Sequence, residues 1–258
     1  MQKRHLDRKQ YFRELAVTSE NYYIPYIQSV KDIHAGMEVL EIGCGEGGNL
    51  VPFSKLGCNT LGVDIAECRI REAKDFFKNE NLCGEFLVCD FLETQIKSKK
   101  FDVILCHDVY EHIPDKEQLL SRAKDLLKPD GVFFISFPSW QMPFGGHQQI
   151  CRNKVISHIP FIHLLPSGIY KTLLKAFHTE DGTIRELMSI KATRAYISDF
   201  EKKIEATSLK IQDKQFYFIS PHYEVKFGLR PRLLYSVLAR VTFIRSVLTS
   251  SCFYLVRR

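Results

Sequence analysis

Residues 38–50 read Glu-Val-Leu-Glu-Ile-Gly-Cys-Gly-Glu-Gly-Gly-Asn-Leu, and this stretch decides how the chain folds. The apolar run at 39–42 predicts a short buried strand. The Gly-x-Gly-x-Gly-Gly turn that follows permits backbone conformations and close approaches that a Cβ would forbid. A helix that begins near Gly48 would point its free N–H groups at this turn. The stretch therefore predicts a loop that presents bare main chain to an acceptor-rich ligand.

Three further apolar runs follow, and each ends in polar or acidic side chains. They read Leu-Gly-Val-Asp-Ile at 61–65, Glu-Phe-Leu-Val-Cys-Asp-Phe at 85–91 and Phe-Asp-Val-Ile-Leu-Cys-His-Asp at 101–108. The carboxyl ends of parallel strands meet at one edge of a sheet, where doubly wound folds bind nucleotides. Asp64 has the spacing of the carboxylate that accepts hydrogen bonds from a ribose. We therefore expect one cofactor crevice at the ends of four strands.

Together with Leu-Leu-Lys-Pro-Asp-Gly-Val-Phe-Phe-Ile-Ser at 126–136, these motifs resemble class I S-adenosylmethionine-dependent methyltransferases, and in particular small-molecule or quinone O-methyltransferases. The resemblance covers residues 30–138 in the right order, whereas a nicotinamide dehydrogenase would share only the first loop and the acid after the second strand. It implies an α/β fold with a three-layer, Rossmann-like sheet. That sheet would be mostly parallel, with an antiparallel C-terminal strand and a helical lid insertion. It also implies an enzyme whose cofactor is S-adenosylmethionine.

The resemblance also implies which residues bind the cofactor. Glu41, Gly43 and Gly45 match the first motif, which contacts the methionine part and shapes the loop, and Asp64 matches the ribose acid. For Glu41 the alternative is an ordinary carboxylate that caps a nearby amide. The expected cofactor-binding residues are Glu41, Gly43, Cys44, Gly45, Asn49, Asp64, Ile65, Asp90, Phe91, Cys106 and His107.

The resemblance also implies which residues lie beside the adenine base and the sulfonium of the cofactor. By the same resemblance, Ile65 packs on the adenine, Asp90 bonds its amino group and Phe91 borders the ring. Asp90 has the same alternative as Glu41, a strand-end capping role. Cys106 and His107 lie where the family places main chain beside the sulfonium.

Methyl transfer from a sulfonium requires alignment of the acceptor and removal of a proton. His147, in the Gly-Gly-His turn after the fifth strand, has a reference pKa close to neutral and is the expected general base. A structural or substrate-orienting histidine is the alternative. His107 and Asp108, at the end of the fourth strand, are the next catalytic candidates.

A cation site is a further interpretation of the same region. Asp108, Glu111 and His112 have the i, i+3 and i+4 spacing that places side chains on one helix face. The pattern is similar to a Glu-x-x-Glu-His of quinone O-methyltransferases, but it begins with Asp. Because Glu-His after this strand is common in the wider fold, we include no metal among the expected ligands.

Charge is distributed unevenly along the 258 residues, whose net charge is +6. The first 150 residues hold more acidic than basic side chains, and the remainder is strongly basic. After Glu224 no acidic residue follows, while seven Lys and Arg residues remain. An anionic acceptor or an acidic membrane surface would be attracted to this segment. Nucleic acid is disfavoured as a partner, because no RNA-binding module is recognisable.

Cysteine usage and the termini suggest a cytoplasmic chain, with peripheral contact to the inner membrane surface as one interpretation. The eight cysteines include no C-x-x-C pair, which suggests reduced thiols rather than disulfides or a zinc framework. Residues 1–10 lack the apolar segment of a signal peptide, and no run of about 18 uncharged apolar residues exists to span a bilayer.

The chain reads as one methyltransferase domain with decorations. Its expected parts are an N-terminal helical lid at 1–34, a cofactor-binding core at 35–138, a substrate-cover insertion at 139–190, and the end of the sheet with a basic segment at 191–258. We expect helices near 7–34, 48–56, 67–79, 115–127 and 193–207, helical spacing at 231–249, a tight turn at 128–131, and strands at 132–137, 210–219 and 252–257.

The methyl acceptor is the least defined part of the predicted function. The sequence after the fourth strand is His-Asp-Val-Tyr rather than Asn/Asp-Pro-Pro-aromatic, which disfavours base amines and glutamine amides. A hydroxyl on a small, glycan or lipid-linked acceptor fits the apolar insertion and the basic rim. An RNA methyltransferase and a cofactor-binding partner protein without activity are the alternatives, and the oligomeric state stays open.

Overall fold

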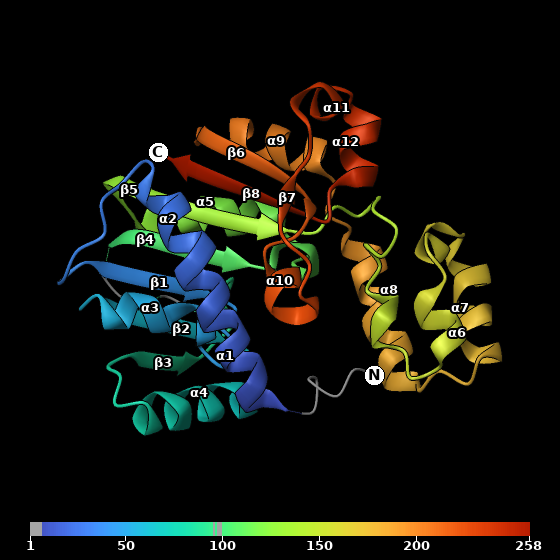
Figure 1. Cartoon of the computed structure of the whole chain (residues 1–258), viewed down its shortest axis with the longest axis horizontal. Coiled ribbons are helices and arrows are strands. Elements are labelled where there is room, and N and C mark those ends of the chain that lie inside the picture. Colours follow the sequence, from blue (N-terminus) through green and yellow to red (C-terminus); the bar gives the residue numbers. More distant parts are fainter. Residues whose placement is uncertain (1–6, 95, 97–99) are drawn as a thin grey trace.

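Eight strands form one sheet in the order β3-β2-β1-β4-β5-β8-β6-β7 in the computed structural model, which describes residues 7–94, 96 and 100–258 (Figure 1). Strands β1 to β5 are parallel, β8 is antiparallel to β5, and β6 is antiparallel to β8. This confirms the expected mostly parallel sheet with an antiparallel C-terminal strand. The strands are β1 (Glu38–Ile42), β2 (Asn59–Asp64), β3 (Glu85–Val88), β4 (Phe101–His107), β5 (Leu127–Phe137), β6 (Lys210–Ile219), β7 (Arg232–Leu233) and β8 (Ser251–Arg257).

Helices connect the strands and cover both faces of the sheet (Figure 1). Short 3-10 helices lie at 48–50, 110–112, 148–150 and 162–164, and a π-helical segment lies at 19–23. The α-helices are α1 (Arg8–Thr18), α2 (Ile24–Gln28), α3 (Val51–Lys55), α4 (Glu67–Asn79), α5 (Lys116–Leu126), α6 (Lys154–His158), α7 (Ser167–Ala176), α8 (Asp181–Thr193), α9 (Ile197–Ala206), α10 (His222–Phe227), α11 (Ser236–Arg240) and α12 (Thr242–Leu248). Among the described helices, none has the length and apolar character required to cross a membrane.

The three layers follow from the alternation of side chains along the central strands. On β1, Leu40 and Ile42 join the apolar cluster that contains α5 and α9, whereas Val39 joins the opposite cluster with α1 to α4. On β4, Ile104 and Val103 divide in the same way. Because both faces of each strand are buried, the strands read as continuous apolar runs, as expected for a parallel sheet.

Most helix predictions hold, but the turn expected at 128–131 is wrong as stated. The structure continues β5 from Leu127 to Phe137 through these residues. Their pairing with β4 is irregular. Phe101 pairs with Leu127, but Val103, only two residues later, pairs with Val132, so β5 has extra residues between the two pairs. The Pro-Asp-Gly segment therefore bulges out of a strand instead of separating a helix from it.

Two C-terminal predictions also need correction. The helix expected at 193–207 is α9, which begins only at Ile197 because α8 extends to Thr193. The helical spacing at 231–249 is not one helix, since Leu234 donates its N–H to the carbonyl of Phe216 beside β7. The extended backbone of Val241, with ψ of 106°, then separates α11 from α12.

The insertion after β5 forms a lobe to one side of the sheet, where α6, α7 and α8 stand together (Figure 1). Its buried apolar residues make a cluster of their own, separate from the two clusters of the sheet. Pro166 precedes α7, and α6 ends before Pro160, so the two prolines interrupt the helices of this segment. The cluster consists of Cys151, Ile156, Ile162, Tyr170, Leu174, Ile184 and Leu187.

The N-terminal aromatic residues have two different roles. Tyr23 and Tyr26 are buried and pack against Phe134 and Phe253 of the sheet, so they are core residues. Tyr11 instead lines a cavity. Residues 1–6 of the expected N-terminal lid lie outside the described part of the chain.

Candidate active site

The glycine turn after β1 leaves open space beside its main chain. Gly43 and Gly45 have φ of 67° and 51°, a region that non-glycine residues rarely adopt. A Cβ on Gly43 would lie 2.3 Å from the side chain of Val109, whereas a Cβ on Gly45 would meet no atom within 4 Å. At Gly43 the turn therefore packs closely against Val109. At Gly45 the backbone is uncovered, so a ligand can contact it directly.

Asp64, the last residue of β2, holds this turn in place. Its Oδ2 accepts the N–H of Gly45 at 2.9 Å, and its Oδ1 accepts the N–H of Ala66 at 2.8 Å. Each carboxylate oxygen can accept a further hydrogen bond, so both remain available to a pair of hydroxyls. Ile65 follows with 73% of its surface exposed, an apolar side chain placed where a ring could cover it.

Glu41 is a buried acid with one oxygen left without a partner. It is only 1% exposed, and its Oε1 accepts a hydrogen bond from Asn49 at 2.7 Å. Its Oε2 has no hydrogen-bond partner among the described residues. Burial raises the pKa of this carboxyl to about 8. An unsatisfied buried carboxyl beside the glycine turn fits a cationic ligand group such as an ammonium.

Two arginines join helices α1 and α4 to the glycine turn. Arg8 and Arg69 both bind the same carboxylate oxygen of Glu46, whose side chain is buried. Ion pairs therefore link helix α1 to the glycine turn.

Cys44 is buried in the turn after β1, and further expected cofactor residues lie at the ends of β3 and β4. Asp90 accepts the N–H of Leu92 at 2.8 Å, so it has the capping role given above as the alternative and keeps its second oxygen for other contacts. Phe91 is buried under the guanidinium of Arg122. The Cys106 side chain lies in the core of the sheet, so only its main chain can contact a ligand.

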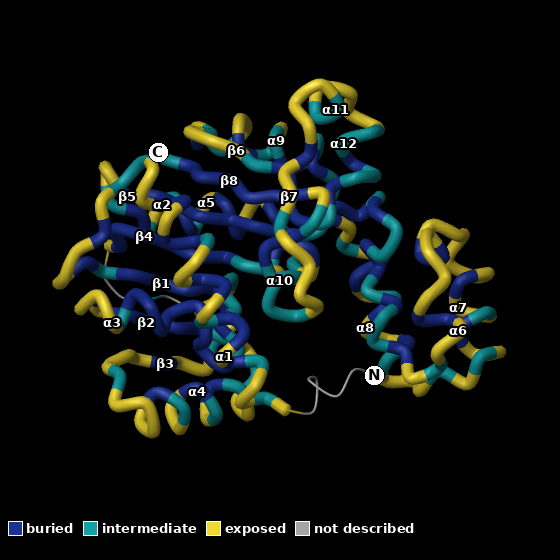
Figure 2. Tube along the Cα trace, viewed as in Figure 1, coloured by how far each residue is buried: buried dark blue, intermediate teal, exposed yellow. Residues whose placement is uncertain are grey.

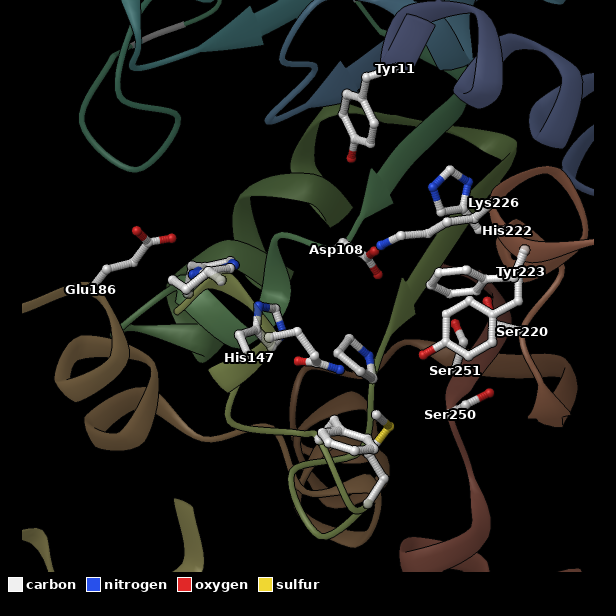
Figure 3. A pocket seen from close by; sticks show the side chains of 17 residues that line it. Tyr11, Asp108, His147, Glu186, Ser220, His222, Tyr223, Lys226, Ser250 and Ser251 are labelled. Atoms are coloured by element: carbon white, nitrogen blue, oxygen red, sulfur yellow. The ribbon is translucent and has the colours of Figure 1, made fainter. Parts of the chain in front are cut away.

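A cavity of about 360 Å³ lies beyond the ends of β4 and β5. Asp108 follows β4, His147 comes from the loop after β5, and Tyr11 reaches in from α1 (Figure 3). Tyr223 and Lys226 of α10 face them, and the amine of Lys226 points toward Asp108 (Figure 3). The cavity adjoins the end of β4, the strand next to which the strand order reverses at β1, and such reversal points are the usual ligand sites of these sheets.

Two residues of this cavity hold strained backbone conformations. Asp108 has φ of 51° and His147 has φ of 58°, both in the left-handed region. The N–H of Asp108 donates to the carbonyl of Ser136 at 3.0 Å, which fixes its turn against β5. Strain of this kind concentrates at functional sites, because it fixes the direction of a side chain.

His147 meets Glu111 and His112, although 35 residues separate His147 from His112 in the sequence. The Nε2 atoms of His147 and His112 lie 3.7 and 3.8 Å from Oε1 of Glu111. Burial lowers the pKa of His147 to about 4 and also lowers that of His112, while it raises the pKa of Glu111. Both imidazoles are therefore neutral at pH 7 and can accept a proton or bind a cation.

Within the part of the chain that the structure describes, these three groups could hold a metal ion. Their ligand atoms lie within 4.8 Å of one another. Neither oxygen of Glu111 has a hydrogen-bond partner among the described residues, so a divalent cation would satisfy a buried carboxylate. The structure thus adds His147 to Glu111 and His112 of the sequence motif. Asp108, the first residue of that motif, lies outside the group.

His107 is held away from the cavity. Its Nδ1 lies 2.6 Å from the Ser136 hydroxyl and its Nε2 lies 3.1 Å from the Tyr23 hydroxyl. The side chain is nearly buried, and it does not line the cavity. Its geometry suits a residue that supports Asp108 better than one that meets an acceptor.

Several cavity residues did not emerge from the sequence. Glu186 of α8 and Tyr223 of α10 come from segments whose patterns indicate only helices or loops. Lys226 was visible only as one of the C-terminal cations. Tyr11 stood in an aromatic segment, but nothing in the sequence distinguishes it from Tyr23, which is buried in the core.

A second cavity of about 660 Å³ adjoins the first, with which it shares Phe144, Gln149, Tyr223 and Phe227. Its other side chains come mostly from the insertion. They include apolar and basic groups, and no acidic one. These residues are Cys151, Arg152, Lys154, Ser157, His158 and Leu229.

Comparisons with known proteins point to methyltransferases. Residues 40–135 match a family model described as a methyltransferase domain. The chain is 32% identical over 123 residues to a ubiquinone biosynthesis O-methyltransferase of Bartonella bacilliformis, which covers 46% of this chain and 50% of that protein. The corresponding protein of Actinobacillus pleuropneumoniae is 34% identical over 118 residues, or 44% and 50% of the two chains. The chain therefore spans about half the length of these curated relatives.

Solved structures extend the likeness in fold to nearly the whole chain. A putative sarcosine dimethylglycine methyltransferase of Galdieria sulphuraria matches with a TM-score of 0.60 and 12% identity, over 93% of this chain and 85% of that one. Magnesium protoporphyrin IX methyltransferase of Synechocystis, solved with bound S-adenosylhomocysteine, matches with a TM-score of 0.57 and 16% identity, over 97% and 84%. At these identities the likeness shows the fold.

Proposed function

We propose that this chain, whose residues 40–135 form a class I S-adenosylmethionine-dependent methyltransferase domain, transfers the methyl group to a hydroxyl of a small, glycan or lipid-linked acceptor. The observation that supports the hydroxyl acceptor best is the cavity beyond β4 and β5. There the neutral, half-buried imidazole of His147 faces a space for a ligand of about 360 Å³. The O-methyltransferase relatives point to the same kind of acceptor.

The bound cofactor would supply a methyl group already activated on a sulfonium. Glu41 would attract its ammonium, Gly45 would give its methionine part a close approach, and Asp64 would hold the ribose hydroxyls. Ile65 and Asp90 would bind the face and edge of the adenine. The protein then has to align the acceptor oxygen with the methyl group and remove the hydroxyl proton.

We propose that His147 removes this proton. Its pKa is lowered by burial, so the imidazole is neutral across the physiological range and its strained backbone aims it into the cavity. The alternative is that His147, His112 and Glu111 together hold a divalent cation that favours the ionised acceptor. Either role places the acceptor hydroxyl at this end of the cavity.

The second cavity supports an acceptor with an apolar part and an acidic group. Phe144, Phe227 and Leu229 line it, and Arg152 and Lys154 lie among the same residues. An apolar tail would bury surface against the first three residues. A carboxylate or phosphate would be attracted by Lys154, whereas Arg152 is already paired with Glu180 at 2.6 Å. We propose that the acceptor extends from His147 into this cavity.

The test of this function begins with calorimetric titration of S-adenosylmethionine, S-adenosylhomocysteine and, as a contrast, NADH. We expect saturable binding of both sulfur compounds and none of NADH. Phenols and catechols with and without apolar tails would follow, with S-adenosylhomocysteine release as the readout. Failure of folded, ligand-free protein to bind either sulfur compound would contradict the proposal, and binding of NADH would favour a dehydrogenase. Binding without turnover on any hydroxyl or RNA substrate would favour a partner protein without activity.

The pH dependence of cofactor affinity tests the role of Glu41. In the free protein its pKa is raised to about 8, so the carboxyl is mostly protonated at pH 6. A ligand ammonium favours the ionised form, and its binding must therefore release a proton. We expect the affinity for S-adenosylhomocysteine to rise by up to about tenfold for each pH unit between pH 6 and 7.5. Calorimetry in buffers of different ionisation enthalpy measures the proton directly.

Glu41→Gln provides the control for this titration, because it keeps a hydrogen-bond acceptor for Asn49 but cannot ionise. Its affinity should be lower and nearly independent of pH. Asp90→Asn should retain the pH dependence. An equal pH dependence in wild type and Glu41→Gln would place the released proton elsewhere.

We propose a cytoplasmic location with contact between the basic C-terminal segment and the inner membrane surface. The eight cysteines are free thiols in the structure, and the second cavity suits an acceptor that carries an apolar tail. Fractionation of cells that express the tagged chain would test the location, since a protein found only in the soluble fraction at low salt would contradict the membrane contact.

A further inference from the structure

Large apolar side chains meet solvent on a surface formed by β7, α11 and α12, which we call the C-terminal face. Tyr235 is 80% exposed, Val237 72% and Phe243 71%, and Leu233 and Val241 are also exposed. In Figure 2 α11 is exposed and lies at the opposite end of the molecule from α4. Five such side chains within eleven residues are more than the isolated apolar residues common on protein surfaces, and they mark an interaction surface.

The local structure explains why these side chains point outward. Leu234, Leu238 and Leu248 of the same segment pack against the main core. The break at Val241 leaves two short helices, each with one inward side and one outward side. The inward side is filled by these leucines, so the remaining apolar residues have no place in the core.

The charges of this segment are all of one sign. Arg230, Arg232 and Arg240 are exposed beside the apolar residues. Arg245 turns inward, where it bonds Glu201 at 3.2 Å. No acidic residue follows Glu224 in the sequence. The C-terminal face therefore combines exposed aromatic and aliphatic side chains with uncompensated positive charge.

We infer that the C-terminal face docks on an anionic lipid bilayer. Its apolar side chains would enter the boundary between headgroups and acyl chains, Tyr235 would lie at the interface, and the three arginines would meet anionic headgroups. A second copy of this chain fits less well, because a symmetric contact would oppose arginines to arginines. The inference rests on the membrane contact proposed above and gives it a surface. It does not depend on the methyl acceptor, since none of these residues lines either cavity.

Co-sedimentation with phosphatidylcholine vesicles, with and without phosphatidylglycerol, tests the electrostatic part. We expect binding only to the anionic vesicles, and weaker binding as salt is added. The variant Arg230→Gln/Arg232→Gln/Arg240→Gln should lower this binding at least about tenfold. Its control is Arg71→Gln/Lys74→Gln/Lys78→Gln, which removes three exposed charges from α4 and should bind like the wild type.

Fluorescence tests the apolar part. A Phe243→Trp variant should be quenched by brominated acyl chains in anionic vesicles, whereas a Leu87→Trp variant on β3, also at an exposed position, should not. The inference is overturned if the triple variant of the C-terminal face binds anionic vesicles as strongly as the triple variant of α4. It is also overturned if the wild type forms a dimer that Phe243→Ser disrupts and binds no vesicle. Thermal unfolding of each variant checks that these exposed changes leave the fold intact.

Discussion

Replacement of His147 by asparagine is expected to lower kcat by about 10²-fold to 10⁴-fold, the usual contribution of a positioned proton acceptor. Asparagine tolerates the left-handed backbone that His147 holds at φ of 58°, so the loop should keep its shape. Affinity for S-adenosylhomocysteine should stay the same, because His147 lies on the acceptor side of the cavity. Single-turnover transfer and calorimetry on the same preparation separate the two quantities.

The control for this variant is His178→Asn. His178 also holds a left-handed backbone, with φ of 55°, but it lies in the insertion outside both cavities. We expect its kcat to equal that of the wild type. Turnover that survives in His147→Asn at every pH tested would place the base elsewhere.

His112→Ala and added metal ions distinguish the two roles proposed for His147. A simple base predicts that His112→Ala keeps most of the activity and that a chelator has no effect. A cation at Glu111, His112 and His147 predicts that both treatments abolish transfer and that a divalent ion restores the chelated enzyme. The low pKa of His147 predicts in addition that its protonation causes no loss of rate above about pH 5.

Replacement of Asp64 by alanine is expected to raise the dissociation constant of S-adenosylhomocysteine by roughly tenfold to a hundredfold. Charge-assisted hydrogen bonds to the ribose are worth about 1.5 to 3 kcal/mol. The change also removes the acceptors for Gly45 and Ala66, which shape the glycine turn. Calorimetry measures the affinity, and thermal unfolding of the free protein measures the cost to the turn.

Asp115→Ala is the matched control for the structural part of this loss. Asp115 accepts the N–H of Gln118 at the start of α5, so Asp115→Ala also removes a helix cap. Asp115 lies far from the glycine turn in the sequence. Both variants should lose stability, while only Asp64→Ala should lose affinity. An unchanged dissociation constant in Asp64→Ala would remove this residue from the ribose role.

The core of the fold could be predicted from the sequence because it depends on local patterns. Buried strands that end in polar residues, and the glycine turn after Ile42, are visible without tertiary information. The antiparallel strand β8 was expected only from the resemblance, and the structure confirms it. Residues 40–135 match a family model described as a methyltransferase domain, in line with the resemblance.

The acceptor side could not be predicted in the same way, because it depends on contacts between distant segments. The neighbourhood of Glu111 and His147 arises only when the loop after β5 folds back over β4. Tyr223 and Lys226 approach the cavity from a helix near the C-terminus. The short strand β7 depends on pairing with β6, which no periodicity within 231–249 reveals. The individual roles of the cofactor and catalytic residues stay predictions.

The separate apolar cluster of the insertion has a consequence for how this protein can evolve. Since Tyr170, Leu174 and Leu187 bury one another rather than the sheet, changes among them cost the lobe its own packing and spare the cofactor crevice. The lobe also supplies much of the second cavity. Selection can therefore alter, lengthen or exchange this lobe, and with it the acceptor that we propose for the second cavity, while the glycine turn and its strands are kept unchanged.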